Sequence, residues 1–232
     1  MNTSETKSRI DDLFKAGAHF GFVRSRRHPT AKPFIYGAKN KIEIFDLEKT
    51  SEELEQVLEF IQHLGKENAP ILMVGGKSEA REAIRRGAES LNMPFVAGRW
   101  IGGTLTNFSE IKKRVQKLED LTTQKEKGEL GKYTKKERLL IDREIENLNR
   151  FFSGLSNMAN LPKALFVIDS KHEHTAIAEA KRMGIPTISL SGSDCNLKDV
   201  DHPIPGNDAS RPSIEYFVGE VVKAYREGKA KQ

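Results

Sequence analysis

Glycine and lysine residues that could hold a phosphate follow an apolar run near the first third of the chain. Gly76-Lys77-Ser78 follows the run at residues 70–74, after Gly75. A triphosphate-binding loop needs another glycine five positions before Gly76, where this chain has Ile71. We therefore expect no nucleoside triphosphate site, although Lys77 at a helix start is a candidate contact for an RNA phosphate. No G-x-G-x-x-G motif follows a predicted strand, so dinucleotide binding is unsupported as well.

Possible metal ligands occur in the C-terminal half. His172 and His174 are two positions apart, and on a helix their side chains diverge by roughly 200°, so they cannot chelate as an i, i+4 pair does. No nucleophile and base can be assigned from spacing, so we expect no catalytic site, metal or cofactor. A further loop is rich in possible ligands, for which we favour solvated turn residues over a metal site: Asp194, Cys195, Asp199, Asp201 and His202.

The strongest chemical signal is a basic arm in which residues 13–42 contain no acidic side chain. Aromatic side chains are interleaved with the cations, and glycine and proline interrupt regular helix. Such a loop can follow a phosphate backbone and stack on exposed bases. The alternative is a solvated loop whose aromatic residues cover the edge of the domain. The predicted RNA contacts are Arg24, Arg26, Arg27, Lys32, Lys39 and Lys41.

The segment 95–108 contains the only tryptophan, next to an arginine, and turns through two glycines. Its end, at Thr106 or Asn107, is a suitable N-cap for a long charged helix. Arg99 and Trp100 can pack on RNA or brace the root of an insertion, and bracing is the favoured role for Trp100.

The insertion at residues 104–156 has two narrow apolar seams with three- and four-residue spacing, joined by a glycine-containing turn. This pattern predicts an antiparallel coiled-coil hairpin that reaches on the order of 30 Å from the body. A narrow seam buries little, so we expect the hairpin to contact a partner; the alternative is a helical layer folded onto the sheet. Its candidate RNA contacts are Lys112, Lys113, Arg114, Lys135, Lys136 and Arg138.

Apolar strands alternate with helical patterns on both sides of this insertion, as in a doubly wound parallel sheet. We predict an α/β fold, a flavodoxin-like three-layer sandwich with a five-stranded parallel sheet, and an irregular loop at residues 191–208. The predicted units are a basic arm at 1–41, the α/β domain at 42–103 and 157–228, and the hairpin at 104–156. The predicted strands lie at residues 42–47, 70–74, 94–97, 164–168 and 186–190.

Composition restricts the class of protein. The chain has 232 residues, a net charge of +5 and one cysteine, which excludes an internal disulfide and suits a reducing cytoplasm. No run of 18 apolar residues is present, and the polar N-terminus lacks an apolar signal core, so we expect neither membrane insertion nor secretion. The positive charge is concentrated in the arm and the insertion, which indicates a polyanionic partner.

Several motifs in the same order resemble the family of bacterial ribosomal protein S-two, the second protein of the small subunit. Together they span residues 13 to about 220. They are Gly17-Ala18-His19-Phe20-Gly21, Lys32-Pro33-Phe34-Ile35-Tyr36-Gly37-Ala38, Asp46-Leu47-Glu48-Lys49-Thr50, Arg99-Trp100-Ile101-Gly102-Gly103-Thr104-Leu105-Thr106-Asn107, residues 161–169, Gly184-Ile185-Pro186 and Ile204-Pro205-Gly206-Asn207-Asp208.

This resemblance implies a structural, non-enzymatic protein that binds 16S ribosomal RNA and contacts neighbouring small-subunit proteins in the cytoplasm. It also implies help in docking the mRNA-binding protein one, and no membrane or small-molecule partner. Departures from the family pattern occur at Phe22, in the stretch 194–199 and at Ala209, and the last two bear on any metal or protein-one contact there. Two other classes compete: a flavodoxin-like nucleotide-binding enzyme, and a protein-only adaptor that acts through the hairpin.

Overall fold

A parallel sheet of five strands forms the centre of the molecule. The computed structural model describes residues 3–231, apart from the side chains of residues 3–7 and 132. The strand order is β5-β4-β6-β7-β8, which is 2-1-3-4-5 in chain order, the order of flavodoxin-like doubly wound sheets. The strands are β4 (Ile71–Val74), β5 (Phe95–Val96), β6 (Ala164–Ile168), β7 (Thr187–Ser191) and β8 (His202–Pro205).

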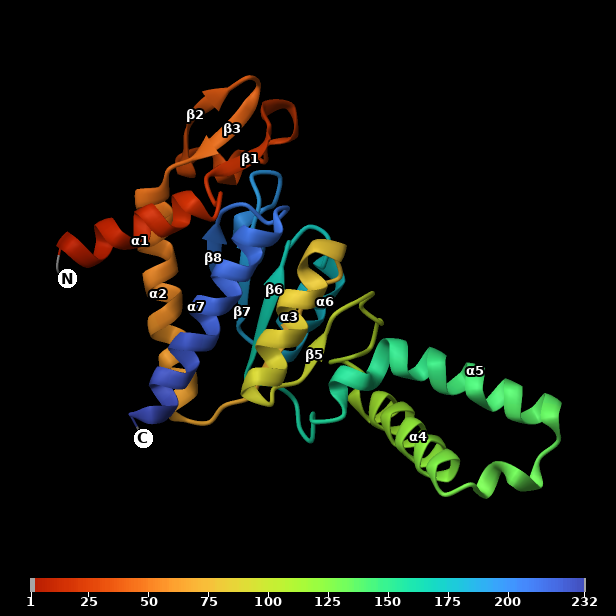
Figure 1. The fold of residues 1–232 in the computed structure, drawn as a ribbon. Coiled ribbons are helices and arrows are strands. Elements are labelled where there is room, and N and C mark those ends of the chain that lie inside the picture. The colour runs from red at the N-terminus through yellow and green to blue at the C-terminus, as the bar shows by residue number, and fades with distance from the viewer. Residues whose placement is uncertain (1–2, 232) are drawn as a thin grey trace.

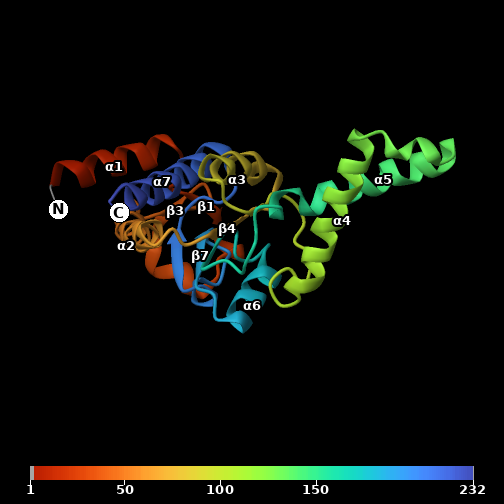
Figure 2. The same cartoon turned by 90° about the horizontal axis from the view of Figure 1, so that it is seen from below.

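Helices cover both faces of this sheet, so its strands are apolar on both sides. Ile71 and Met73 face one core and Leu72 and Val74 the other, because successive side chains of a strand point to opposite faces. Helices α2 (Leu47–Lys66), α3 (Ser78–Leu91) and α7 (Arg211–Ala230) pack on the first face, and α6 (His174–Met183) lies on the second (Figures 1 and 2).

Local signals define the helix ends. Asp46 caps α2 by accepting a hydrogen bond from the backbone N–H of Glu48 at 3.1 Å, and Ser210 caps α7. Helix α6 ends at Gly184, whose φ of 65° lies in the left-handed region that glycine adopts freely. Helices α2 and α7 approach closely at Gly228, where a Cβ would lie 2.1 Å from the Gln62 carbonyl oxygen.

The N-terminal part is more regular than the predicted loop. After α1 (Thr3–Lys15), the strands β1 (Phe20–Val23), β2 (Ile35–Lys39) and β3 (Ile42–Phe45) form an antiparallel sheet in the order β1-β3-β2. This set of strands is called the small sheet below. Short helical turns, η1 (Arg24–Arg26) and η2 (Pro29–Phe34), connect β1 to β2. The glycines and prolines that favoured a loop lie in these turns and at the irregular points of the pairing.

Two predictions about which strands form the parallel sheet were wrong. The predicted strand at 42–47 is β3, which belongs to the small sheet, because Asn40 and Lys41 both have positive φ and form a two-residue hairpin with β2. The fifth parallel strand is instead β8, inside the stretch 191–208 that was expected to be irregular. Pro203 and Pro205 concealed it; they are tolerated because β8 lies at the edge of the sheet.

Two helices extend away from the sheet beyond the β5 edge (Figure 1). They are α4 (Phe108–Glu126) and α5 (Lys135–Phe152), followed by the turns η3 (Glu129–Lys132) after α4 and η4 (Ser153–Leu155) after α5. Ile111, Leu118, Leu148 and Phe152 are buried in the same core cluster, and Lys125 pairs with Asp142 across the two helices at 2.7 Å. The alternative of a helical layer over the sheet is not what the structure shows.

Candidate nucleic-acid interface

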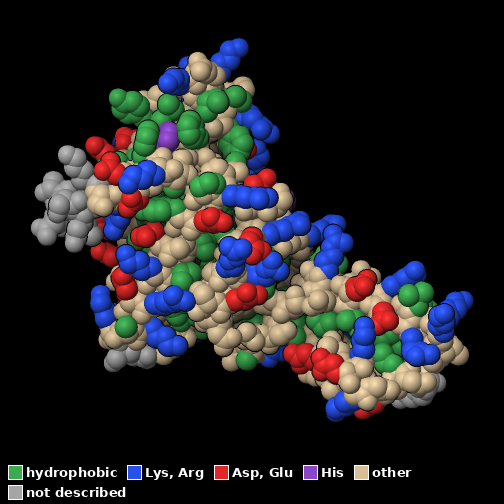
Figure 3. Space-filling model, in the orientation of Figure 1, with side chains coloured by type: hydrophobic (Ala, Val, Ile, Leu, Met, Phe, Trp, Pro, Cys, Tyr) green, Lys and Arg blue, Asp and Glu red, His purple; other side chains and the backbone are tan. Residues whose placement is uncertain are grey.

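Five of the six predicted arm cations are exposed on the small sheet or its turns. Lys39 ends β2 and Lys41 lies in the β2–β3 turn, Arg24 and Arg26 lie in η1, and Lys32 lies in η2. Lys and Arg side chains are visible around this sheet beside an apolar area (Figure 3). These cations lie on one small, folded unit, which is better suited to a defined contact than a disordered basic tail.

Arg27 differs from the other arm cations. Its Nη1 lies 2.8 Å from Oε1 of Glu43, whose side chain is 1% exposed. Oε2 of Glu43 is buried and has no hydrogen-bond partner among the described residues. A buried carboxylate that loses its counter-charge is costly, so Arg27 has a structural role whether or not it also contacts RNA.

Aromatic side chains of the arm form a partly exposed stack. Phe14 and His19 are stacked with ring centroids 4.5 Å apart, and His19 lies 4.0 Å from Phe20. Phe14 is 61% exposed, Phe20 49% and Tyr36 81%. Large exposed rings next to cations are the combination that unstacked bases bind, and Phe22 is covered instead by Arg26 at 5.4 Å.

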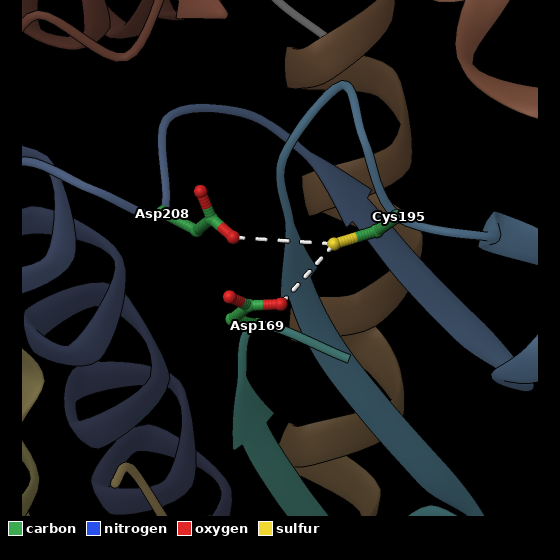
Figure 4. Close-up of side chains that lie close together, drawn as sticks. All are labelled: Asp169, Cys195 and Asp208. Atoms are coloured by element: carbon green, nitrogen blue, oxygen red, sulfur yellow. Dashed lines mark hydrogen bonds between the residues drawn. The ribbon is translucent and has the colours of Figure 1, made fainter. Parts of the chain in front are cut away.

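Lys77 lies in a buried charge cluster at the carboxyl edge of the parallel sheet. Its Nζ is 2.5 Å from Oδ2 of Asp169 and 3.3 Å from Oδ2 of Asp208. The Cys195 thiol lies 3.4 Å from Oδ1 of Asp169 and 4.0 Å from Oδ2 of Asp208 (Figure 4). The charge of Lys77 is therefore engaged inside the protein, and its contact with an RNA phosphate remains a prediction.

Burial controls the protonation of this cluster. It raises the pKa of Asp208 to about 6. The charge of Asp169 raises this pKa further, and the charge of Lys77 lowers it but does not outweigh burial. Burial and then the two carboxylates raise the pKa of Cys195 to about 12, so the thiol stays protonated at neutral pH. Burial alone would lower the pKa of Lys77, but Asp208 and Asp169 outweigh it and hold that pKa above its usual value. The cluster is thus a buried ion-pair network with an ammonium at its centre.

The side chains of the five possible metal ligands in residues 194–202 do not converge on one point. Asp194 pairs with Lys171, and Asp201 accepts hydrogen bonds from the backbone and hydroxyl of Thr187. His202 stacks on Phe60 at 4.4 Å, and Asp199 lies near Lys181. Only Cys195 of that set joins the Asp169–Asp208 pair. Sequence spacing does not predict this pair, because Asp169 and Asp208 meet only through the ends of β6 and β8. The available signal was an Asp directly after a buried strand.

Trp100 is 8% exposed and braces the root of α4, as its favoured role predicted. Its Nε1 donates to Oε1 of Glu179 at 3.0 Å, and the same carboxylate accepts from the backbone N–H groups of Gly103, Leu105 and Thr106. Burial opposes ionisation, but these donors outweigh it and lower the pKa of Glu179. Arg99, by contrast, is exposed.

The predicted hairpin cations are all exposed. Lys112 lies over the Phe108 ring at 4.9 Å and Lys113 pairs with Glu110, which leaves both ammonium groups at the surface. Lys135 and Lys136 open α5, and a capping box between Thr134 and Glu137 fixes that start. The structure thus places the candidate cations in two separate regions, the small sheet and the α4–α5 pair, with Arg99 between them.

Comparison with known protein families agrees with this arrangement. The family model described as "Ribosomal protein S2" matches residues 13–228. The chain belongs to the ribosomal protein S2 family. Membership makes it a ribosomal protein of the small subunit, and so part of the translation apparatus.

Individual relatives cover nearly the whole chain. The small ribosomal subunit protein uS2 of Coprothermobacter proteolyticus is 41% identical over 220 residues, which is 95% of this chain and 82% of the relative. The protein of the same name from a Nitratiruptor species is also 41% identical, over the same shares of both chains. Among the described residues, no helix is both long and apolar enough to cross a membrane.

Proposed function

We propose that this protein is a structural, non-enzymatic component of the cytoplasmic small ribosomal subunit that binds 16S ribosomal RNA. The observation that carries the proposal is the set of exposed cations and rings on the small sheet, in a chain of the ribosomal protein S2 family. Cations that contact phosphates release counterions, and the adjacent rings offer stacking surfaces.

The α4–α5 pair supplies the second part of the proposed interface. We propose that it forms an antiparallel coiled coil, supported by its narrow buried seam and by ion pairs across the two helices. Its exposed cations would contact RNA away from the body. The exposed aromatic area of the small sheet also supports contact with a neighbouring small-subunit protein, including the mRNA-binding protein one.

The test is sedimentation of the tagged protein from lysate, with and without RNase. The variant removes three exposed arm cations, Arg24→Ala, Arg26→Ala and Lys39→Ala. Arg27 is left in place because its loss would leave the buried Glu43 carboxylate without its counter-charge. We expect the wild type to migrate with the small subunit and the variant to be displaced from it. In filter binding, its salt slope should fall by about 2 to 3 if each cation meets one phosphate.

The matched control removes the same charge from the far end of the body, at Lys66, Lys223 and Lys229, which are exposed near the C-terminal end of α7. We expect this control to sediment as the wild type does. A wild-type protein that sediments slowly without RNA would overturn the proposal, and a nucleotide-binding screen would then test the competing enzyme class.

A further inference from the structure

Two cavities adjoin beside the root of the α4–α5 pair. The first has a volume of about 580 Å³ and lies between α3, β5 and the end of α5. The second has a volume of about 610 Å³ and lies between the turn after β4, the segment 99–102 and the start of α6. Arg81 and Arg99 line both cavities, so these two residues lie where the cavities adjoin.

The walls of these cavities are predominantly basic. Arg85 and Arg150 line the first cavity in addition to the two shared arginines, and Glu89 is the only acidic residue there. In the second cavity the acidic residue is Glu173, 3% exposed, whose Oε1 accepts a hydrogen bond from the Gly76 backbone N–H at 3.0 Å. The net positive charge favours an anionic ligand.

The two shared arginines are held differently. The Nε of Arg81 donates to the Gly76 carbonyl oxygen at 3.3 Å, which orients its guanidinium toward the turn after β4. Arg99 is exposed, and it has no ion-pair partner among the side chains that the structure describes. A guanidinium presents several N–H donors in a planar fork that matches phosphate oxygens. One phosphate between Arg81 and Arg99 would therefore satisfy both.

We propose that the paired cavities bind an unstacked, single-stranded RNA segment, with one phosphate between Arg81 and Arg99 and one nucleoside in each cavity. This inference rests on the proposed RNA-binding function and adds a site and a class of RNA structure to it. Neither the basic arm nor the predicted hairpin contacts include Arg81, Arg85 or Arg150.

The shape of the site favours single-stranded RNA over a duplex. Both volumes fall within the roughly 300–1,000 Å³ of pockets that enclose small ligands. A base inside a duplex is stacked and cannot enter such a cavity, whereas a base in a loop or bulge can be splayed out. Aromatic surface is present for it: Phe95 and Phe151 line the first cavity, and Arg150 lies 5.4 Å from the Phe151 ring centroid.

The surroundings favour a polymer over a free nucleotide. The cavities adjoin each other at Arg81 and Arg99 and open to solvent, so a chain can enter one and leave through the other. A triphosphate-binding loop at the turn after β4 would require a glycine at position 71, where this chain has the first residue of β4, Ile71. The site also lies between the body and the α4–α5 pair, and so between the two proposed RNA-binding regions.

The experiment measures binding of the full-length chain to a fluorescent oligouridylate of about ten nucleotides, a length within the usual site size of single-strand binders. We expect Arg99→Ala and Arg81→Ala each to weaken this binding by about tenfold, the scale of one charge-assisted phosphate contact. Arg86→Ala is the matched control, because Arg86 is an exposed arginine on the same helix that lines neither cavity. Circular dichroism verifies folding, and Arg99→Glu gives a second variant at an exposed position.

Location is tested with the same RNA carrying 4-thiouridine. We expect crosslinks at Phe95, Phe151 or their neighbours, lost in Arg99→Glu. Crosslinks confined to the small sheet, equal binding of a duplex of the same length, or unchanged binding by both arginine variants would each overturn the inference. Full competition by uridine monophosphate would show a free-nucleotide site instead of an RNA site, and so would also overturn it.

Failure of this inference is distinguishable from failure of the proposed function. If the wild type sediments with the small subunit and binds ribosomal RNA, but the oligouridylate assay is unaffected by Arg81 and Arg99, only the cavity site is wrong. If the wild type binds no RNA at all, the proposed function itself fails.

Discussion

Two buried carboxylates, Asp208 and Glu179, are in opposite electrostatic situations. Asp208 has one nearby cation and a second carboxylate beside it, and its Oδ1 is buried without a hydrogen-bond partner among the described residues. Glu179 accepts hydrogen bonds from one side chain and several backbone groups of the 100–106 segment. Burial is therefore uncompensated at Asp208 and more than compensated at Glu179, which raises one pKa and lowers the other.

The raised pKa of Asp208 predicts a specific pH dependence of stability. Because the folded-state pKa is about 6 against a usual 3.8, the folded protein binds the proton more tightly than the unfolded chain. The stability from Asp208 is present below pH 4 and is lost as pH rises through 6, by about 3 kcal/mol in all. In urea unfolding, the free energy of unfolding of Asp208→Asn should rise relative to that of the wild type by this amount between pH 4 and pH 7.

Asp201→Asn serves as the control for that measurement. Hydrogen bonds from Thr187 outweigh burial and lower the pKa of Asp201, so its contribution changes only below pH 4. The difference between Asp201→Asn and the wild type should stay constant from pH 4.5 to pH 7. A constant difference for Asp208→Asn over the same range would refute the raised pKa.

The hydrogen bonds at Glu179 predict a local loss of order. Glu179→Ala removes the acceptor of the Trp100 Nε1–H and of the backbone N–H groups of Gly103, Leu105 and Thr106, at a cost of about 1 to 3 kcal/mol for each donor that stays buried. Amide hydrogen exchange at Gly103, Leu105 and Thr106 should accelerate by at least tenfold. Glu173→Ala is the comparison, because that buried carboxylate binds the turn after β4 and should leave these three amides unchanged.

At the scale of elements, positive charges in the first turn of α5 destabilise the start of that helix. Lys135 and Lys136 occupy the first turn of the helix, where the backbone dipole disfavours cations. The capping box between Thr134 and Glu137 opposes this and holds the helix start. Cations that weaken their own helix are better explained by a partner than by stability, which supports their proposed contact with RNA.

Stability and binding should therefore respond to different changes at this helix. Replacing Lys135, Lys136 and Arg138 by Ala should leave the helix as stable as before, or more stable by a few tenths of a kcal/mol, while RNA affinity falls and its salt slope decreases. Thr134→Ala should do the reverse, with about 1 kcal/mol lost from the helix and RNA affinity nearly unchanged. Hydrogen exchange of α5 and filter binding at two salt concentrations measure both quantities. An equal loss of affinity in both variants would show that the cations do not contact RNA.

At the scale of the whole molecule, the candidate contacts occupy separate places around a neutral-to-acidic centre. Residues 42–103 hold seven Lys and Arg against eleven Asp and Glu, whereas residues 1–41 hold nine against three. The small sheet and the α4–α5 pair lie on different sides of the parallel sheet (Figure 1). Linked contacts on one body strengthen each other through effective concentration, so modest affinity at each region suffices.

Local features of the sequence were sufficient to predict much of this arrangement. Residues 71–74 and 164–168 form short continuous apolar runs, which are typical of strands buried on both faces, and both are strands of the sheet. The start of α4, with Asn107 at its N-cap position, and the apolar spacing of α4 and α5 were equally visible, because caps and helical periodicity involve neighbours within one or two turns.

Tertiary structure alone decided which strand completes the sheet and which charges are free. The central strands β4 and β6 pair as parallel neighbours, for example at Val74 and Val167. No local pattern indicated that β8, with its two prolines, would form the edge of the parallel sheet beside β7 in place of β3. No local pattern indicated the partners of Lys77 and Trp100, because Asp208 and Glu179 lie 131 and 79 residues away along the chain. Backbone propensities act between near neighbours, whereas the ionisation and exposure of a side chain depend on whatever the fold packs against it.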